Sequence, residues 1–266
     1  MSLNKINILN YFLNFFKVRS FREINKEKVY KIISLLKPYD VGIPLVRIGS
    51  ENDGGYLVPD ILNEIKFCFS PGVGKSSSFE KHLEKFGISS FLADKSVDGP
   101  ANQLNKFDFE KKNINSFDDK DKININTWIE SKVDGNQISN SILQIDTDGY
   151  EYEIFLSLKE SILSEIKIIV VEFHGLELSA NEYFNNVLIS TLEKINLYHT
   201  PVHIHPNNCC GLNKIDNINI PSVMEVTFLN NNLVNKKSKI NYLPNVLDKK
   251  NVNKKKNIIL DDYWYK

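Results

Sequence analysis

Short apolar runs alternate with amphipathic segments along most of this chain, beginning near residue 66. Apolar runs of this kind predict buried strands, whereas apolar residues spaced three and four apart predict helices. Strands that alternate with helices predict a parallel, doubly wound α/β sheet with helices on both faces. The predicted strands are 66–69, 90–93, 107–114, 142–145, 166–173, 198–205 and 223–229, and the predicted helices end near 86 or span 125–132, 152–162 and 180–195.

Two patterns predict antiparallel pairing. Asp53-Gly54-Gly55 lies between two short β-type runs, which is a hairpin signal. No helical pattern separates the runs at 198–205 and 223–229, so the last strand is expected to pair antiparallel.

The two ends of the chain predict different structures. Residues 1–37 have helical periodicity, and their apolar residues are expected to pack on the domain or across a homodimer interface. The alternative is a helix on a membrane surface, because the apolar stretch is too short to cross a bilayer. The expected division is a helical extension at 1–40, an α/β domain at 41–232 and a largely solvated tail at 233–266, in which Trp264 is a candidate to dock.

Charge and cysteine content narrow the class of protein. Lys and Arg number 33 and balance 33 Asp and Glu, so the net charge gives no general attraction to nucleic acid. Cys68 is expected in the core, and the adjacent Cys209 and Cys210 lack the spacing of a zinc or CxxC site. No signal peptide is evident, and a cytoplasmic protein without a transmembrane segment is expected.

Acidic residues end the apolar run at 142–145. Asp146 and Asp148 follow this run directly, and Gly149 marks the turn before the next helix. Ligands of open α/β sheets bind outside the carboxyl ends of the strands. We therefore expect Asp146 and Asp148 to lie at a ligand site.

A glycine loop follows the first predicted strand. Gly72 and Gly74 let the backbone approach a ligand closely, and Asp94 ends the next strand, where a carboxylate suits the hydroxyls of a ribose. The nucleotide could belong to NAD or to S-adenosylmethionine. The third glycine of the NAD fingerprint is Ser77 here, which favours S-adenosylmethionine because that cofactor has no diphosphate. Its adenine is expected near Ser116, after the third strand.

Several blocks resemble the FkbM-type S-adenosylmethionine-dependent methyltransferases. The stretch 143–151 is similar to the family signature K-x-D-x-E-G-x-E, with Gln144 in place of the lysine and Asp148 in place of the first glutamate. Ser70 replaces the acid common in methyltransferase glycine loops, so other groups are expected to hold the amino-acid part of the cofactor. The resemblance implies a class I, Rossmann-like methyltransferase fold and O-methylation of sugars or secondary metabolites. The other blocks are Arg47-Ile48-Gly49, Asp53-Gly54-Gly55-Tyr56, Val171–Gly175, His203–Asn208 and Pro221–Thr227.

Histidines at strand ends are candidate bases. O-methylation requires removal of a hydroxyl proton, and imidazole has a suitable pKa. We expect His174 or His205 to be the base and Asp146 and Asp148 to orient the acceptor. The alternative is that Asp146, Asp148, Glu172, His174 and His205 hold a divalent metal. The expected cofactor ligands are Ser70, Gly72, Gly74, Asp94, Ser116 and Asp146, and the expected acceptor ligands are Tyr56, Glu172, His203 and Asn207.

The sequence thus predicts an S-adenosylmethionine-dependent O-methyltransferase. Its expected acceptor is a sugar, a nucleotide-sugar or another small precursor of a surface glycan such as a capsular polysaccharide. Two alternatives from other classes are a catalytically inactive Rossmann-like binding module and an NAD-dependent oxidoreductase.

Overall fold

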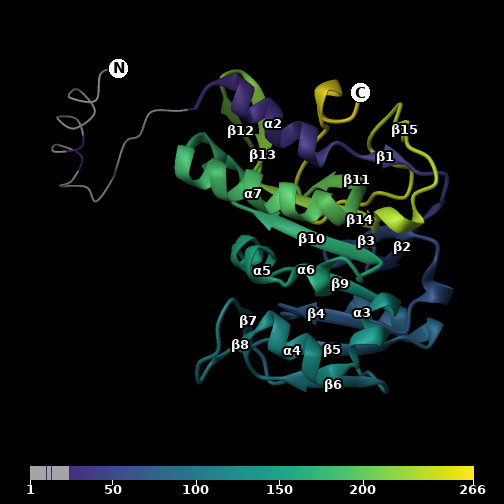
Figure 1. The fold of residues 1–266 in the computed structure, drawn as a ribbon. Coiled ribbons are helices and arrows are strands. Elements are labelled where there is room, and N and C mark those ends of the chain that lie inside the picture. The colour runs from purple at the N-terminus through teal and green to yellow at the C-terminus, as the bar shows by residue number, and fades with distance from the viewer. Residues whose placement is uncertain (1–9, 11–12, 14–23) are drawn as a thin grey trace.

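A seven-stranded sheet forms the centre of the computed structural model, which describes Asn10, Leu13 and residues 24–266. Figure 1 shows the strands stacked from β6 at the bottom to β11 near the top. The five strands from β6 to β10 are parallel, and β14 runs antiparallel to both of its neighbours, which confirms the predicted last strand. In spatial order the strands are β6 (Phe107–Glu110), β5 (Ser89–Ala93), β4 (Phe67–Pro71), β9 (Ser141–Ile145), β10 (Ile168–His174), β14 (Val223–Asn230) and β11 (His199–Pro206).

One face of the sheet is covered by five helices. Their apolar residues and those of the sheet form one large core cluster, which includes Trp128, Phe155 and Phe173. The helix α2 begins at Asn25, whose side chain accepts a hydrogen bond from the Lys28 amide, and it packs on α7. The helices are α2 (Lys26–Leu36), α4 (Ile125–Lys132), α5 (Glu151–Ser157), α6 (Glu160–Leu163) and α7 (Glu182–Tyr198).

Helix α2 lies in the last part of the predicted N-terminal extension and packs on the domain. Its residues Val29, Ile32, Ile33 and Leu36 are buried. Residues 1–9, 11–12 and 14–23 of the predicted N-terminal helical stretch lie outside the described residues.

The opposite face carries α3 (Ser78–Leu83) and the hairpin of β2 (Leu45–Gly49) and β3 (Gly55–Pro59). All five β3 residues are buried, and the Thr227 hydroxyl of β14 donates to the Leu57 carbonyl at 2.7 Å. A second core cluster joins Tyr56 and Phe79 to the sheet. The predicted hairpin is therefore a cover over the sheet rather than an edge.

The third predicted strand is shorter than expected. It ends at Glu110, after which β7 (Asn113–Asn115) pairs with β8 (Lys122–Asn124) in a separate two-stranded sheet. A further hairpin, β12 (Leu212–Ile215) and β13 (Ile218–Pro221), joins β11 to β14. The 3-10 turns are η2 (Leu62–Glu64), η3 (Glu84–Phe86), η4 (Gly135–Asn140), η5 (Leu176–Ala180), η6 (Asn231–Leu233) and η7 (Asp262–Trp264).

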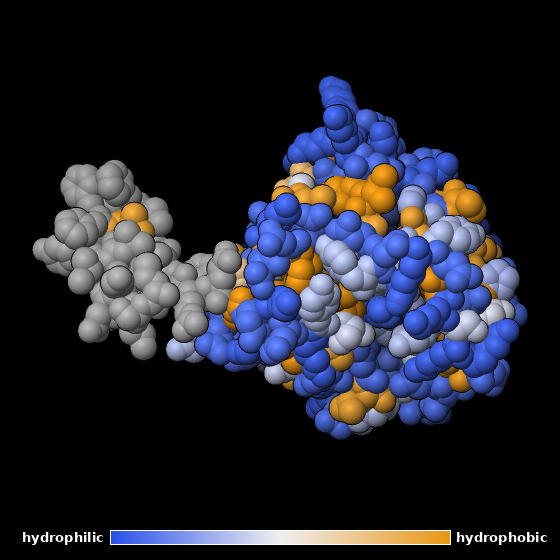
Figure 2. Space-filling model, turned by 90° about the horizontal axis from the view of Figure 1, so that it is seen from above, coloured by the Kyte–Doolittle hydropathy of each residue, from blue (hydrophilic) through white to orange (hydrophobic). Residues whose placement is uncertain are grey.

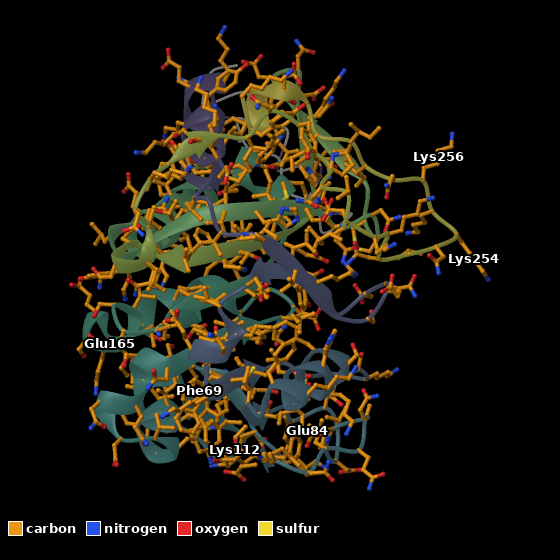
Figure 3. The ribbon with its side chains drawn as sticks, turned by 90° about the vertical axis from the view of Figure 1, so that its right-hand side faces the viewer. Phe69, Glu84, Lys112, Glu165, Lys254 and Lys256 are labelled. Carbon is orange, nitrogen blue, oxygen red and sulfur yellow. A yellow bond between two sulfur atoms is a disulfide. The ribbon has the colours of Figure 1, made fainter. Side chains whose placement is uncertain are left out.

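The C-terminal segment is not the solvated tail that its composition predicts. Its strand β15 (Ser238–Lys239) pairs with β1 (Tyr39–Asp40), and Trp264 is 1% exposed, with its indole N–H donating to the Asn219 carbonyl. Figure 1 shows the yellow C-terminal end beside α2. Much of the segment is still exposed, including Lys254 and Lys256 (Figure 3). It is docked at separate points, through Trp264 at its end and through Asp248 and Asn251, which bond to His203 and Glu225, in its middle.

The surface on the side of α2 and the C-terminal segment is mostly hydrophilic, with separate hydrophobic patches (Figure 2). Among the described residues, none of the helices combines the length and hydropathy needed to cross a bilayer. Cys68 is a buried free thiol as expected, whereas Cys209 and Cys210 are joined by a disulfide.

Candidate active site

A cavity of about 460 Å³ opens at the carboxyl ends of β4, β5 and β9. This is the edge of a parallel sheet at which ligands bind. Six residues predicted for the site line it: Tyr56, Gly72, Gly74, Asp94, Asp146 and Asp148. The predicted residues Ser70, Ser116, Glu172, His174, His203, His205 and Asn207 do not.

The glycine loop brings β4 against the end of β9. Gly72 has φ +81°, and a Cβ there would lie 1.7 Å from the Asp146 carbonyl oxygen. The Gly74 amide donates to the Asp94 carboxylate at 2.7 Å, and Ser96 donates to the other oxygen of the same carboxylate. Asp94, the predicted ribose ligand, therefore also fixes the glycine loop. Its side chain lines the cavity and is 7% exposed.

The predicted adenine ligand lies elsewhere. Ser116 follows β7, and its hydroxyl bonds to the Glu153 carboxylate on α5. Asn113 and Ile114, three and two residues earlier, line the cavity instead. The predicted third strand ran to residue 114, but β6 ends at Glu110. The adenine contact was therefore expected too far along the chain, after β7.

Acidic side chains dominate the charge of the cavity wall. Among the described residues, Lys75 is the one cation that lines it, against the five carboxylates of Asp53, Glu80, Asp94, Asp146 and Asp148. A negative field of this kind favours a cationic ligand and disfavours a phosphate-bearing one.

His174 stands at the end of β10 beside the two predicted aspartates. Its Nε2 lies 3.8 Å from an oxygen of Asp146, of Asp148 and of Glu172. Ligand atoms of Asp146, Asp148 and His174 all lie within 4.8 Å of one another, a group that could hold a metal ion. The structure thus brings three of the four predicted catalytic residues together.

Glu151 orients the turn that carries Asp146 and Asp148 and also orients His174. The sequence analysis assigned Glu151 no role. Its fully buried carboxylate accepts from the amides of Thr147 and Gly149, at 3.1 and 3.0 Å. The same oxygen lies 3.0 Å from His174 Nδ1, so one carboxylate orients both the turn after β9 and the imidazole. Asp148 has φ +51° in that turn, a conformation that Asp tolerates better than most residues. Glu151 is the final glutamate of the 143–151 signature, and this match was the signal from which its role could have been predicted.

Electrostatics favour the charged form of His174. Burial lowers its pKa, but the bond to Glu151 and the charges of Glu151, Glu172 and Asp146 outweigh burial and raise the pKa to about 9. Burial and the neighbouring Glu172 raise the pKa of Asp146 well above its ordinary value. At neutral pH the imidazole of His174 therefore carries a proton.

His205, the other predicted base, lies in a different group. His203 Nε2 and His205 Nδ1 lie 2.9 and 3.6 Å from the two oxygens of Asp248, which comes from the C-terminal segment. Burial acts to raise the pKa of Asp248, but the hydrogen bond with His203 and the nearby His205 outweigh burial and hold this pKa well below its usual range. Both histidines are buried and are not at the cavity, so a direct role in proton removal is not supported.

A row of buried polar side chains links the two groups. Glu172, Glu225 and His205 are cross-strand neighbours on β10, β14 and β11. The predicted acceptor ligand Asn207 instead donates to Glu172 at 2.7 Å and to Asp53 at 3.3 Å. Burial, with the charge of Glu225 next, raises the pKa of Glu172 to about 8. Glu172 and Asn207 thus support the site from behind the cavity.

A family model matches the central part of the chain. No curated protein matches the sequence significantly. The methyltransferase FkbM domain matches residues 60–196, just over half of the chain. This span contains the glycine loop, Asp94, Asp146 and His174, and the sheet order and the cavity agree with a methyltransferase fold. The chain therefore belongs to the FkbM methyltransferase family.

Proposed function

We propose that this methyltransferase uses S-adenosylmethionine to methylate a hydroxyl oxygen of a sugar or another small glycan precursor. A nucleotide-sugar is a weaker candidate acceptor, because its diphosphate would meet the same acidic wall. The observation that carries the proposal is the charge of the cavity, which faces its ligand with five carboxylates and one lysine. S-adenosylmethionine is a net cation through its sulfonium and ammonium groups. The diphosphate of NAD would be repelled by the same wall, which weighs against the oxidoreductase alternative.

The proposal gives the cofactor a defined orientation in the cavity. In this proposal the ribose hydroxyls donate to Asp94, and the adenine lies towards Asn113 and Ile114. The sulfonium methyl then points to the end of β9, where Asp146 and Asp148 stand. Gly74 leaves room for the cofactor along the loop because a Cβ there would meet nothing closer than 4.0 Å, whereas the missing side chain of Gly72 leaves room for the Asp146 carbonyl.

The acceptor binds beside Asp146, Asp148 and His174 in this proposal. Carboxylates accept hydrogen bonds from hydroxyl groups, so this wall suits a hydroxyl-rich acceptor such as a sugar. As the hydroxyl oxygen bonds to the methyl carbon, the sulfonium leaves as a neutral thioether and the hydroxyl proton passes to the Asp146–His174 pair. Because the neighbouring carboxylates raise the pKa of His174 to about 9, the rate should rise with pH up to that value. The positive sulfonium would lower this pKa, so the rise should lie at or below pH 9.

Isothermal titration with S-adenosylmethionine and with NAD tests the cofactor, and transfer of labelled methyl groups to a panel of sugars and nucleotide-sugars tests the reaction. Binding of S-adenosylmethionine with transfer to at least one sugar is the expected result. Binding without transfer to any acceptor would favour an inactive binding module. Binding of NAD alone would refute the proposal.

A further inference from the structure

Glu80 is a buried carboxylate in the cavity wall with no cationic partner. It lies in the first turn of α3, is 2% exposed, and makes no ion pair among the described residues. Burial raises its pKa, because the charged form is poorly solvated there. An unpaired buried carboxylate is costly and is stabilised by any cation that reaches it.

Two neutral oxygens stand next to this carboxylate. The Ser70 hydroxyl, at the end of β4, bonds to a Glu80 oxygen and lies 2.7 Å from the Gln144 side-chain oxygen. Glu80 and Gln144 both line the cavity, while Ser70 joins them from behind. The chain has a serine rather than an acid at position 70, and the carboxylate of Glu80 lies beside that serine in the fold.

We propose that Glu80, with Ser70 and Gln144, is the seat of the cofactor's α-ammonium group. The inference rests on the proposed function, since it assigns one part of S-adenosylmethionine to one part of its cavity. An ammonium donates three hydrogen bonds, and these side chains offer oxygen acceptors beside one negative charge. A sulfonium has no hydrogen to donate, and its methyl must face the acceptor near Asp146. The ammonium is therefore the better match for this pocket.

The test compares two ligands and two variants by isothermal titration. The ligands are S-adenosylhomocysteine and its deamino analogue, which keeps the adenosine, thioether and carboxylate and lacks only the ammonium. Glu80→Gln should weaken S-adenosylhomocysteine roughly 10- to 100-fold and leave the deamino analogue unchanged, because a charged hydrogen bond is lost with one ligand only. Glu84→Gln makes the same change of charge on the next turn of chain, outside the cavity wall, and should alter neither affinity.

Each other outcome is informative. Glu80→Gln resembles the protonated acid in shape and should fold, and binding of the deamino analogue checks this directly. Equal weakening of both ligands would show a structural role and overturn the inference, as would no weakening of either. If the wild-type protein binds both ligands with the same affinity, the ammonium seat is wrong while the proposed cofactor stands. If the wild-type protein binds neither, the proposed function fails and the seat fails with it.

Discussion

Replacing Glu151 with glutamine should disturb His174 through a single hydrogen bond. The buried Glu151 carboxylate lies 3.0 Å from His174 Nδ1, and it is the strongest of the influences that raise this pKa from 6.5 to about 9. Glutamine keeps the size of the side chain and removes the charge. We expect the pKa of His174 to fall in Glu151→Gln towards 6.5.

The sign of the pH dependence follows from the raised pKa. A rise from 6.5 to about 9 corresponds to roughly 3 kcal/mol of stabilisation. This stabilisation is fully present below pH 6.5 and is lost as the pH rises through about 9. Since Glu151→Gln removes part of it, the gap in unfolding free energy between wild type and variant should shrink by roughly 1–2 kcal/mol across that window.

Two measurements check this expectation. Imidazole resonances followed by NMR give the His174 pKa, and urea unfolding at pH 6 and pH 9.5 gives the two free energies. Glu153→Gln changes an exposed carboxylate two residues along the same helix and should leave the His174 pKa unchanged. An unaltered His174 pKa in Glu151→Gln, or a gap that does not depend on pH, would refute the electrostatic account of this site.

Three further predictions concern the cavity itself. Gly72→Ala should destabilise the protein more than Gly87→Ala. Both glycines have φ near +80°, but only at Gly72 would a Cβ meet backbone, at 1.7 Å from the Asp146 carbonyl oxygen. Equal falls in melting temperature would contradict this. Asp94→Ala should weaken S-adenosylmethionine by about 1–3 kcal/mol in titration, and Asp98→Ala, an exposed acid four residues on, should not. His174→Ala should lose ~10²–10⁴-fold in turnover with cofactor binding retained. Loss of activity with a chelator and rescue by a divalent ion would assign the Asp146, Asp148 and His174 group to a metal instead.

Local patterns predicted the sheet well. Apolar runs of strand length reproduced all seven strands of the sheet, because burial on both faces of a parallel sheet requires nearly continuous apolar sequence. Acids and glycines at strand ends indicated the cavity for a separate reason. The carboxyl ends of parallel strands lie along one edge of the sheet, and ligands bind outside that edge. Gly72, Asp94 and Asp146 were found in this way.

Contacts between distant segments were not predictable from these patterns. His203 and His205 alternate along one strand, but no local pattern could show that Asp248, more than forty residues later, would lie against both. The composition of the last segment indicated solvent exposure, and a few buried contacts, such as those of Trp264, were enough to dock it.

The sequence by itself determined the order of strands and helices, the glycine loop and the family, since each depends on residues that are close in the chain or on a recognisable ordered motif. Tertiary structure alone decided which charges meet. Glu80 reaches Ser70 because α3 folds back over β4, and Glu151 reaches His174 because α5 begins beside the end of β10. Coulomb energies and desolvation depend on distance and burial in space, so the pKa of His174 and the unpaired charge of Glu80 exist only in the folded protein.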